Sequence, residues 1–337
     1  MKLDNKRCLV TGGAGFIGSH LVDALMKNNC EVRILDNLVN GKMNNISHHI
    51  GNERFEFVQG SITDPLDVVR ALNEIDVVFH LACLGVRHSI AHPFDTHRVN
   101  AEGSLLTLDA SYRAGVKRFV YCSSSEVYGT AEYVPMPESH PTHPCTVYGS
   151  SKLAGEAYAR AYHRTYGMPT VILRPFNTYG PRSHHEGDAG EMIPKSIVRA
   201  LNDQPILIFG DGNQSRDFTY VEDTASALIA GAETDKIIGQ TLNIGSSFEI
   251  SVKDLACKIL DLLGTSKSQI EHTSDRPGDV MRLYADCKNF VDICNWKPYV
   301  DFEEGLLKTI NYFKNHPLSP KILMNDEAGQ NWEAITN

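Results

Sequence analysis

The chain of 337 residues is predicted to fold as an α/β protein, with a doubly wound parallel sheet and a smaller mixed α/β lobe nearer its C-terminus. Apolar runs of strand length alternate with amphipathic runs of helix length through the first half, which indicates a parallel sheet covered by helices on both faces. The runs at 77–82 and 118–123 are almost continuously apolar, as in strands buried on both faces. A glycine-rich turn after the first strand completes the pattern.

The apolar periodicity predicts each element in order. Strands are predicted at residues 7–11, 31–35, 54–58, 76–81, 118–123 and 169–174, and helices at 16–28, 65–73, 100–114 and 148–166. Residues 1–175 are assigned to the domain with the parallel sheet, and 217–244 are expected to return to it. Residues 176–216 and 245–337 would build the lobe, with the stretch after about His316 only loosely packed because its apolar positions lack a period.

The turn Gly12-Gly13-Ala14-Gly15-Phe16-Ile17-Gly18 lies between a predicted strand and a predicted helix. Gly12 allows a tight turn, Gly15 lets a pyrophosphate approach the backbone, and Gly18 lets the helix pack closely on the strand. The free N–H groups at the start of the helix favour phosphate. The strand, turn and helix together are the fingerprint of a Rossmann-type dinucleotide site.

A second predicted strand ends at Asp36-Asn37, 18 residues after Gly18. A carboxylate at this place can accept hydrogen bonds from both ribose hydroxyls and would repel a 2′-phosphate. We therefore expect the cofactor to be NAD and not NADP, with Asp36 and Asn37 beside its ribose.

Tyr148 and Lys152 are four residues apart in a predicted helix, so their side chains share one face. An ammonium group beside a phenol favours the phenolate, and a tyrosine can then act as a base despite an ordinary pKa near ~10. Ser124, Ser125 and Glu126 follow a predicted strand upstream, and such strand ends line the ligand crevice of parallel sheets. These five residues are the predicted catalytic centre of a dehydrogenase-type site.

The composition of the chain argues against several classes of function. The net charge is −9 and no basic run occurs, so nucleic acid is not an expected partner. No apolar segment reaches membrane-spanning length and the first residues lack a signal-peptide pattern, so we expect a cytoplasmic protein without a membrane partner. The eight cysteines are scattered and are expected to be free thiols. No metal site is predicted, because the adjacent histidines His48-His49 and His184-His185 should point apart.

Several motifs together resemble one family. The chain carries Thr11 to Gly18 (TGGAGFIG), Leu81-Ala82, Ser123 to Gly129 (SSSEVYG), Tyr148-x-x-x-Lys152 and Arg174 to Arg182 (RPFNTYGPR). This set resembles the extended short-chain dehydrogenase/reductase family and, within it, the NAD-dependent sugar-nucleotide epimerases, dehydratases and decarboxylases. The similarity runs from residue 7 to about residue 315, and it specifies the superfamily more than the reaction.

The resemblance implies a role for each matched residue. Tyr148 would remove the proton from the carbon 4 hydroxyl of a nucleotide-linked hexose, Lys152 would hold the nicotinamide ribose and lower the tyrosine pKa, and Ser124 would hydrogen-bond to the same sugar oxygen. The cofactor would contact Gly12, Gly15, Phe16, Ile17, Gly18, Asp36, Asn37, Ser61, Ile62, Leu81, Ala82, Asn100, Tyr148 and Lys152. The sugar diphosphate would contact Arg87, Asn177, Arg216 and Arg276, and arginine forks suit phosphate oxygens.

Two positions depart from the family pattern. Family members commonly have an aspartate where this chain has Ser61, so the adenine amine is expected to be held less tightly. The best-known 4,6-dehydratases carry Asp-Glu after the catalytic hydroxyl residue, whereas this chain carries Ser125-Glu126. The position of the base is therefore filled, and the position of the acid holds a group that does not ionise.

Glu126 separates the candidate reactions. A 4,6-dehydratase needs a base for the proton at carbon 5, a 4-epimerase does not, and a decarboxylase uses a similar motif on a glucuronic acid. The motifs favour a 4,6-dehydratase, for which a UDP-N-acetylhexosamine is one candidate substrate, then a 4-epimerase, then a decarboxylase. Three alternatives stay open: a Glu126 that only bonds to backbone amides, an ion pair of Arg216 and Arg276 with nearby aspartates, and a non-enzymatic NAD sensor.

A homodimer is expected, because the family pairs the helices at 100–114 and 148–166 across a two-fold axis. The second helix carries small residues that allow close approach, namely Ala154, Ala157, Ala159 and Ala161. The alternative is that these alanines only pack on the sheet.

Overall fold

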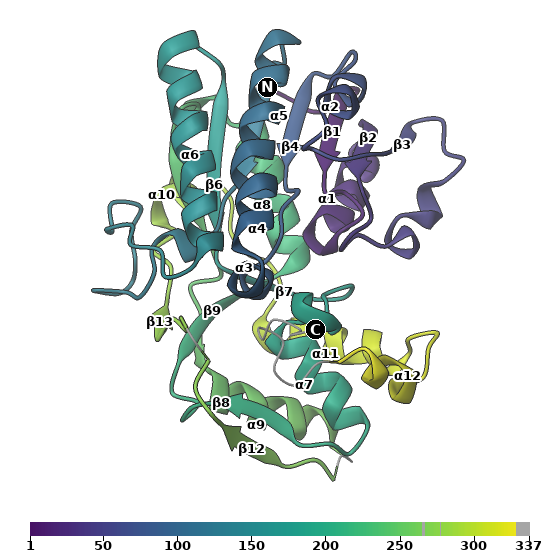
Figure 1. The fold of residues 1–337 in the computed structure, drawn as a ribbon, viewed down its shortest axis with the longest axis vertical. Helices are drawn as coiled ribbons and strands as arrows, with labels where there is room; N and C mark the ends of the chain where they lie inside the picture. Colours follow the sequence, from purple (N-terminus) through teal and green to yellow (C-terminus); the bar gives the residue numbers. More distant parts are fainter. Residues whose placement is uncertain (265–266, 277, 328–337) are drawn as a thin grey trace.

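The computed structural model describes residues 1–264, 267–276 and 278–327, and its centre is a parallel seven-stranded sheet (Figure 1). Across the sheet the strands lie in the order β10, β6, β5, β4, β1, β2, β3. Their bounds are β1 (Arg7–Thr11), β2 (Glu31–Asp36), β3 (Phe55–Gln59), β4 (Val77–His80), β5 (Arg118–Cys122), β6 (Thr170–Pro175) and β10 (Thr241–Ile244). The strand order reverses direction between β1 and β4, which places the ligand crevice at the carboxyl ends of these two strands.

Helices cover both faces of this sheet because successive side chains of a buried strand point to opposite sides. Cys8 and Val10 pack toward one face and Leu9 toward the other. The first face is covered by α1 (Phe16–Lys27) and α8 (Val221–Glu233). The second face is covered by α2 (Pro65–Ala71), α5 (Gly103–Arg113) and α6 (Val147–Tyr166). The arrangement confirms the predicted fold class.

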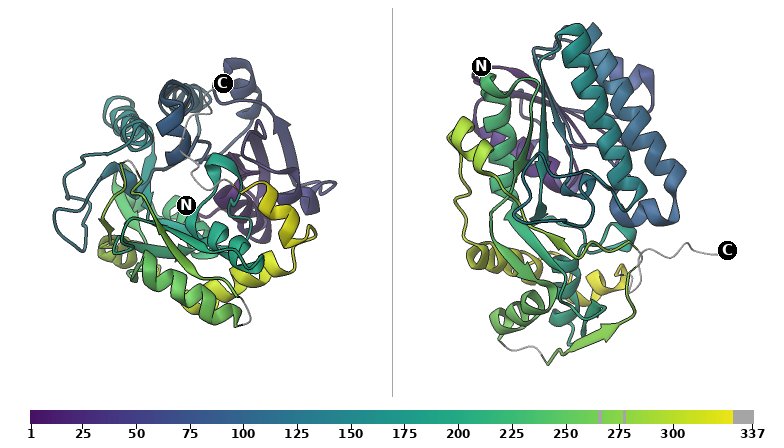
Figure 2. Two further views of the ribbon diagram at one scale, coloured as in Figure 1. Left: turned by 60° about the horizontal axis from the view of Figure 1, so that its bottom comes forward. Right: turned by 90° about the vertical axis from the view of Figure 1, so that its left-hand side faces the viewer.

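The lobe lies below the sheet in the view of Figure 1, and Figure 2 shows it from two further sides. It has an apolar core of its own. Its strands are β7 (Asn177–Tyr179), β8 (Ile206–Phe209), β9 (Ser215–Tyr220), β11 (Glu249–Ser251), β12 (Ile270–Thr273) and β13 (Arg282–Leu283). Its helices are α7 (Met192–Leu201), α9 (Val252–Leu263), α11 (Phe302–Lys314) and α12 (Pro320–Asn325). The remaining helices are α3 (Val86–Ala91), α4 (Pro93–His97) and α10 (Lys288–Cys294).

The predicted elements of the first half agree with the structure to within a few residues. The predicted helix 100–114 begins earlier, because a π-helical turn at Arg98–Glu102 leads directly into α5. The expectation of loose packing after His316 is wrong for the described part, since α12 lies on α7 and Leu323 is buried in the lobe core. Periodicity alone could not predict this contact, because α12 is a short helix with only one deeply buried residue.

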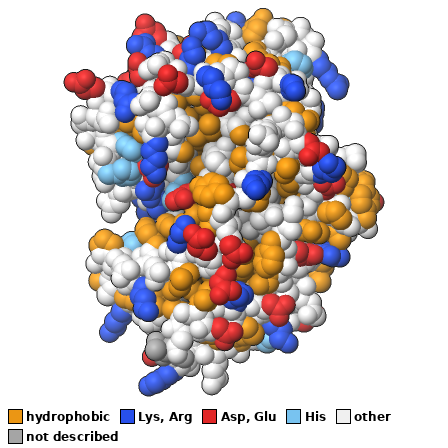
Figure 3. Space-filling view, turned by 180° about the vertical axis from the view of Figure 1, so that it is seen from behind, with side chains coloured by type: hydrophobic (Ala, Val, Ile, Leu, Met, Phe, Trp, Pro, Cys, Tyr) orange, Lys and Arg blue, Asp and Glu red, His pale blue; other side chains and the backbone are white. Residues whose placement is uncertain are grey.

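The expectations from composition concern the thiols, the helices and the charges on the surface. All eight cysteines are free thiols. No helix among the described residues is long and apolar enough to cross a membrane. Acidic and basic side chains are interspersed over the face seen from behind, without a basic stripe (Figure 3).

Candidate active site

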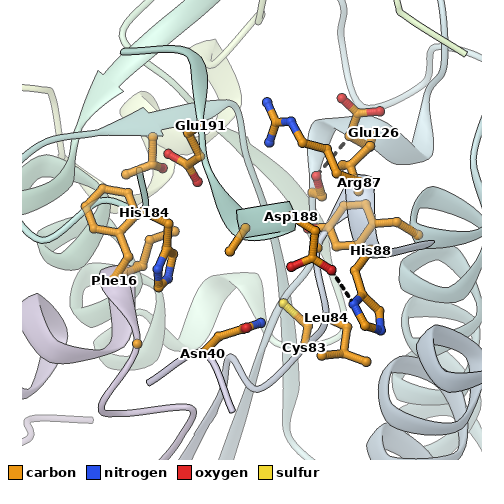
Figure 4. A pocket seen from close by; sticks show the side chains of 18 of the residues that line it. Phe16, Asn40, Cys83, Leu84, Arg87, His88, Glu126, His184, Asp188 and Glu191 are labelled. Carbon is orange, nitrogen blue, oxygen red and sulfur yellow. Dashed lines mark hydrogen bonds and ion pairs between the residues drawn. The ribbon is translucent and has the colours of Figure 1, made fainter. Parts of the chain in front are cut away.

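A cavity of about 780 Å³ lies between the carboxyl ends of the sheet strands and the lobe (Figure 4). It brings together segments that are far apart in the sequence. Of the predicted site residues it is lined by Gly12, Gly15, Phe16, Ile17, Gly18, Asp36, Asn37, Ser61, Ile62, Leu81, Ala82, Arg87, Ser124, Ser125, Glu126, Tyr148, Lys152, Asn177, Arg216 and Arg276. Asn100 alone of the predicted residues lies outside this lining.

The glycine turn leaves room at one end of the cavity. Gly12 has a positive φ of 71°, and a Cβ atom there would lie 2.8 Å from the Cα of Ala82. A Cβ on Gly18 would lie 2.1 Å from the carbonyl oxygen of Gly12, so helix and turn are in closest contact at this point. A Cβ on Gly15 would meet only the Gly12 carbonyl oxygen within 4 Å, so this residue faces open space. The turn is therefore shaped to admit a pyrophosphate to the start of α1.

Asp36 ends β2 at the same end of the cavity. Its carboxylate accepts hydrogen bonds from the backbone N–H groups of Ala14 (3.0 Å) and Leu38 (2.8 Å), which fixes its orientation. Burial raises the pKa of Asp36, and these two hydrogen bonds lower it in part. Each oxygen keeps a lone pair for a ribose hydroxyl. The cradle of glycines and this oriented carboxylate fit a dinucleotide without a 2′-phosphate.

Asn100 acts behind the cavity wall. Its Oδ1 accepts a hydrogen bond from the Leu84 N–H at 2.8 Å, and its Nδ2 donates to the Leu84 carbonyl at 3.0 Å. Both polar atoms of the amide hold the loop at Cys83-Leu84, and the contact of Asn100 with the cofactor stays a prediction. That loop does line the cavity.

A buried histidine of β4 is hydrogen-bonded to β1 and to α5 below the cavity. His80 bonds Thr11 Oγ1 through Nδ1 and Ser104 Oγ through Nε2, both at 2.9 Å. Thr11 Oγ1 also accepts hydrogen bonds from the N–H groups of Leu81 and Ala82. Burial and the nearby charge of Lys152 lower the pKa of His80 to about 3, so this imidazole is neutral.

Tyr148 and Lys152 project from the first turns of α6 into the centre of the cavity. Thr146 caps this helix by accepting a hydrogen bond from the Gly149 N–H, which sets where the helix begins. The Lys152 ammonium donates to the Cys122 carbonyl at 2.9 Å and lies 5.9 Å from the centre of the Tyr148 ring. The predicted catalytic pair is thus assembled around the end of β5.

Burial acts in opposite directions on the pKa values of Tyr148 and Lys152 and is outweighed only at Lys152. Burial raises the pKa of Tyr148, and the Lys152 charge and Ser124 hydroxyl oppose it without cancelling it. The expected lowering of the tyrosine pKa by Lys152 is present but smaller than the effect of burial. Burial lowers the pKa of Lys152, but Cys83, Tyr121 and Tyr148 raise it above its ordinary value, so the ammonium stays charged.

Glu126 lies in the cavity beside Ser125. Its carboxylate makes no hydrogen bond to any described residue, so the alternative of a glutamate bonded to backbone amides is not what the structure has. Burial raises the pKa of Glu126, and Arg216 and Arg276 act against this. Ser125 is buried and lines the same wall.

The two lobe arginines share one partner. Asp279 Oδ1 accepts from Arg216 Nη2 at 2.9 Å and also from Arg276 Nη2. The ion-pair alternative therefore holds for Asp279, whereas the Asp217 carboxylate accepts from Ser246 and Ser247. Both arginines nevertheless line the cavity, so a diphosphate can compete with a single carboxylate for them.

Two predicted substrate contacts carry polar groups without partners. The buried Oδ1 of Asn177 has no hydrogen-bond partner among the described residues. The Arg87 guanidinium likewise makes no ion pair within the described chain, and it points into the cavity between Glu126 and Glu191 (Figure 4). Burial and the nearby Arg276 lower the pKa of Arg87 to about 10. Buried polar groups without partners indicate places where a ligand completes the hydrogen bonding.

Sequence reasoning missed several residues of this wall. Burial raises the pKa of Glu191 to about 7, so this carboxyl is partly protonated at neutral pH. His88 of α3 bonds Asp188 of the lobe at 2.5 Å across the cavity (Figure 4). Cys83 also lines the cavity. Glu191 and Cys83 belong to no motif with fixed spacing, and His88 and Asp188 are far apart in the sequence, so only the three-dimensional arrangement identifies this wall.

A buried acidic residue from the C-terminal segment reaches the far end of the cavity. Glu327 pairs with Arg199 at 2.8 Å and with Lys195 at 3.2 Å, and its side chain is 2% exposed. The Asp326 carbonyl accepts from the Gly187 N–H, which fixes the approach of this segment. The two cations lie on α7, whose hydrophobic side packs in the lobe core.

The adjacent histidines do not point apart as predicted. His48 and His49 both approach Asp23 Oδ1 at 2.8 Å. His184 and His185 both approach the Glu186 carboxylate at 3.0 Å. The prediction assumed a regular helix or strand, whereas His48 and His49 lie in a 3₁₀ turn and the second pair lies in a loop.

Comparisons with known proteins agree with this geometry. The sequence profile of the NAD dependent epimerase/dehydratase family matches residues 8–245. A putative UDP-glucose 4-epimerase of Methanocaldococcus jannaschii is 40% identical over 311 residues, which cover 91% of this chain and 98% of that protein.

Solved structures share the whole architecture. The UDP-N-acetylglucosamine 4-epimerase of Methanobrevibacter ruminantium M1, in complex with UDP-N-acetylmuramic acid, matches with a TM-score of 0.86 and 37% identity over 92% of this chain and 98% of that one. The dTDP-glucose 4,6-dehydratase DesIV of Streptomyces venezuelae, solved with NAD bound, matches with a TM-score of 0.87 and 32% identity over 92% of this chain and 97% of that one.

Proposed function

The chain belongs to the NAD dependent epimerase/dehydratase family and takes NAD as its cofactor, and on this premise we propose that it is a nucleotide-sugar 4-epimerase. The substrate would be a hexose linked to a nucleoside diphosphate, oxidised at carbon 4 and reduced again from the opposite face. The observation that carries the proposal is the convergence of Tyr148, Lys152 and Ser124 beside a serine, Ser125, where an elimination would need an acid.

The catalytic pair moves one proton in each direction. Tyr148 takes the proton of the carbon 4 hydroxyl, and the Ser124 hydroxyl hydrogen-bonds to the oxygen as it becomes a carbonyl. The glycine turn and Asp36 would hold NAD, which would supply a hydride acceptor and donor for carbon 4 and a positive charge near the phenol. The Lys152 charge, held by the Cys122 carbonyl, stabilises the phenolate between these events. Tyr148 then returns the proton to the oxygen.

Two observations support our proposal of an epimerase over the dehydratase that the motifs favoured. Ser125 is buried and cannot supply the ionisable acid that loss of the carbon 6 hydroxyl needs. The archaeal proteins named above, at 40% and 37% identity, are a putative and a structurally characterised 4-epimerase. An epimerase requires only oxidation, turning of the keto sugar and reduction, all of which this site can serve.

The lobe would hold the nucleotide diphosphate. Arg216 and Arg276 offer guanidinium forks for the phosphate oxygens, and the unpaired amide oxygen of Asn177 would accept a hydrogen bond from a hydroxyl of the substrate. The apolar side chains of Leu207 and Phe209 in β8 line the same end and would flank the base.

One observation keeps a 4,6-dehydratase as the second candidate. The Glu126 carboxylate has no hydrogen-bond partner among the described residues and lies where a base for the carbon 5 proton would act. Glu191, with a pKa of about 7, offers a proton donor in the same cavity. A dehydratase would then use Glu191 where its relatives use an aspartate after the catalytic hydroxyl residue.

Mass spectrometry in deuterated water separates the two reactions. We would incubate the protein with UDP-, dTDP-, GDP- and CDP-hexoses and follow product mass and chromatographic mobility. A new stereoisomer of unchanged mass is expected for the epimerase. Loss of a water mass with deuterium incorporated at carbon 5 would instead establish the dehydratase and overturn the proposal. If no nucleotide sugar of the panel were converted, the result would favour the alternative of a non-enzymatic NAD sensor.

We also propose that the protein forms a homodimer through α5 and α6, which lie side by side on an outer face (Figure 2). The exposed apolar residues Leu105, Tyr112 and Tyr166 lie on these helices. Ala157 and Ala161 are exposed, whereas Ala159 is fully buried against the sheet and takes no part. Light scattering at micromolar concentration should give twice the monomer mass, and a monomeric mass would exclude the dimer.

A further inference from the structure

Three side chains away from the cavity converge on one point of the surface. Asp23 lies on α1, and His48 and His49 lie in the 3₁₀ turn η2 (Ser47–His49). Both Nε2 atoms lie 2.8 Å from Asp23 Oδ1, and all three ligand atoms lie within 4.8 Å of one another. None of them contributes to the proposed reaction.

The backbone of the turn produces this convergence. In a helix or strand adjacent side chains diverge, but here the two imidazole centroids are only 4.1 Å apart with planes inclined by 44°. Phe55 packs against His49 and limits its rotation, with ring centroids 5.4 Å apart. His48 is more exposed, at 47%, and can adjust. One imidazole is therefore fixed and the other can adapt to a ligand.

The donor set suits a late first-row divalent cation. Two imidazole nitrogens and one carboxylate oxygen are a common zinc ligand set, at ~2.0–2.2 Å from the metal. Tetrahedral coordination at these bond lengths needs donors a little more than ~3 Å apart, so a small outward rotation of His48 is sufficient. A shallow hollow lined by the three residues and Asn52 leaves the fourth position open to water.

The surrounding charges decide which metals can bind. Arg182 pairs with the other oxygen of Asp23 at 2.9 Å, and Lys27 and Arg54 also line the hollow. These cations cancel the attraction of a single carboxylate for Ca²⁺ or Mg²⁺, which bind through several oxygens. Zn²⁺, Co²⁺, Ni²⁺ and Cu²⁺ bind more strongly to imidazole nitrogen, so the nearby cations reduce their affinity less.

We propose that Asp23, His48 and His49 form a binding site for a divalent late first-row metal, with Zn²⁺ as the typical occupant. The metal would join η2 to α1 and so stabilise the segment between Asp36 and η2.

This segment supports the cofactor end of the cavity. Asn45 donates from Nδ2 to the Ala14 carbonyl at 2.9 Å, and the Lys42 N–H donates to the same carbonyl at 3.0 Å. Ala14 belongs to the glycine turn, and its N–H bonds Asp36. A metal on the proposed site would therefore make the protein more resistant to unfolding and NAD binding tighter, without contacting NAD.

Metal binding is tested directly on the full chain after treatment with a chelator and desalting. Calorimetric titration with Zn²⁺ should show one site in the wild type, weakened about tenfold or more in His48→Ala and His49→Ala. His97→Ala, an exposed histidine paired with Glu102, is the matched control and should bind like the wild type. Mg²⁺ and Ca²⁺ should give no heat.

Two further readouts separate this site from the free thiols. Co²⁺ should give visible bands of a nitrogen and oxygen site, and an intense thiolate charge-transfer band instead would assign the metal to cysteine and overturn the proposal. Zn²⁺ should raise the melting temperature of the wild type but not of His49→Ala, as expected for a ligand of the folded state. Equal zinc binding by wild type and both histidine variants, or none by the wild type, would also overturn it.

Discussion

The two ends of the cavity are built in different ways. At the cofactor end the polar groups are already paired within the protein: Asp36 with two backbone N–H groups, Lys152 with a carbonyl, and Asn100 with Leu84. At the end proposed to bind the sugar nucleotide, Arg216 and Arg276 share one carboxylate, and Asn177 has an oxygen without a partner among the described residues. The first end is shaped before its ligand arrives, whereas the second needs its ligand to complete its hydrogen bonds.

This difference follows from what each end must do. NAD is the same molecule before and after each turnover, so a fixed site costs nothing in catalysis. In the proposed 4-epimerase the sugar must turn between oxidation and reduction, so contacts that are too complete on that side would hold it in one pose. Arg216 and Arg276 can exchange Asp279 for the diphosphate, so they would hold the nucleotide while the sugar moves. The predictions below test this contrast.

The largest effect is expected from Tyr148→Phe, which removes the proton acceptor from the fixed end. The rate constant kcat should fall by about 10²–10⁴-fold, the usual contribution of a positioned acid–base group. NAD affinity should change little, because the backbone cradle at Gly12–Gly18 is untouched. Tyr158→Phe, on the same helix, is the matched control and should keep full activity. A Tyr148→Phe enzyme with near-normal kcat would remove the tyrosine from the mechanism.

The response of stability to pH should have opposite signs at the two ends. His80 has a folded-state pKa of about 3, below its unfolded value, so the unfolded chain binds more protons below pH ~6.5 and stability falls on acidification. Glu191 has a folded-state pKa of about 7, above its unfolded value, so stability rises on acidification between pH 7 and its ordinary pKa near ~4.3. Each group should contribute roughly 2 kcal/mol between pH 7 and pH 5.

Urea unfolding of two variants at both pH values measures these contributions. His80→Asn should lose less stability than the wild type between pH 7 and pH 5, because its side chain does not titrate. Glu191→Gln should lose more, because the compensating carboxyl is gone. If the free energy of unfolding changed with pH by the same amount in the wild type and both variants, neither His80 nor Glu191 would have a pKa that differs between the folded and unfolded states.

The shared carboxylate can be tested through the substrate arginines. Arg216→Gln should raise KM for the nucleotide sugar about 10–100-fold, the value of a charged hydrogen bond to phosphate. Asp279→Asn should lower KM, by about 3–10-fold, because the substrate no longer competes with a carboxylate. Steady-state kinetics measures both. If Asp279→Asn raised KM as much as Arg216→Gln, Asp279 would be orienting the arginines and the contrast between the two ends would weaken.

The cofactor end could be predicted from sequence because its chemistry depends on backbone shape. Only glycine fits at Gly12 and Gly18, and Tyr148 and Lys152 meet because a helix fixes the spacing of four residues. The sugar-nucleotide end is assembled from side chains of α3, α7, β9 and the segment after β12, and no spacing rule relates them. Glu191 and Glu327 carried no local signal for this reason. The convergence of His48 and His49 was missed because the rule applied to them holds only for regular elements.

The smallest effect is expected at the far end of the cavity, from Glu327→Gln. This change removes the carboxylate that Lys195 and Arg199 share, and a substrate anion at these cations should then bind about two- to fivefold more tightly, as for a weak ion pair. Asp326→Asn is the matched control, because the backbone carbonyl of Asp326 makes its contact with Gly187.

The gain in affinity from Glu327→Gln should depend on pH. Burial lowers the pKa of Lys195 to about 8, and Glu327 acts against this. In the variant the pKa of Lys195 should fall further, so the ammonium loses its charge at lower pH and the advantage in KM should shrink as pH rises through 8. A KM that rises in Glu327→Gln at every pH would mean that the C-terminal segment forms part of the substrate site and does not compete with the substrate.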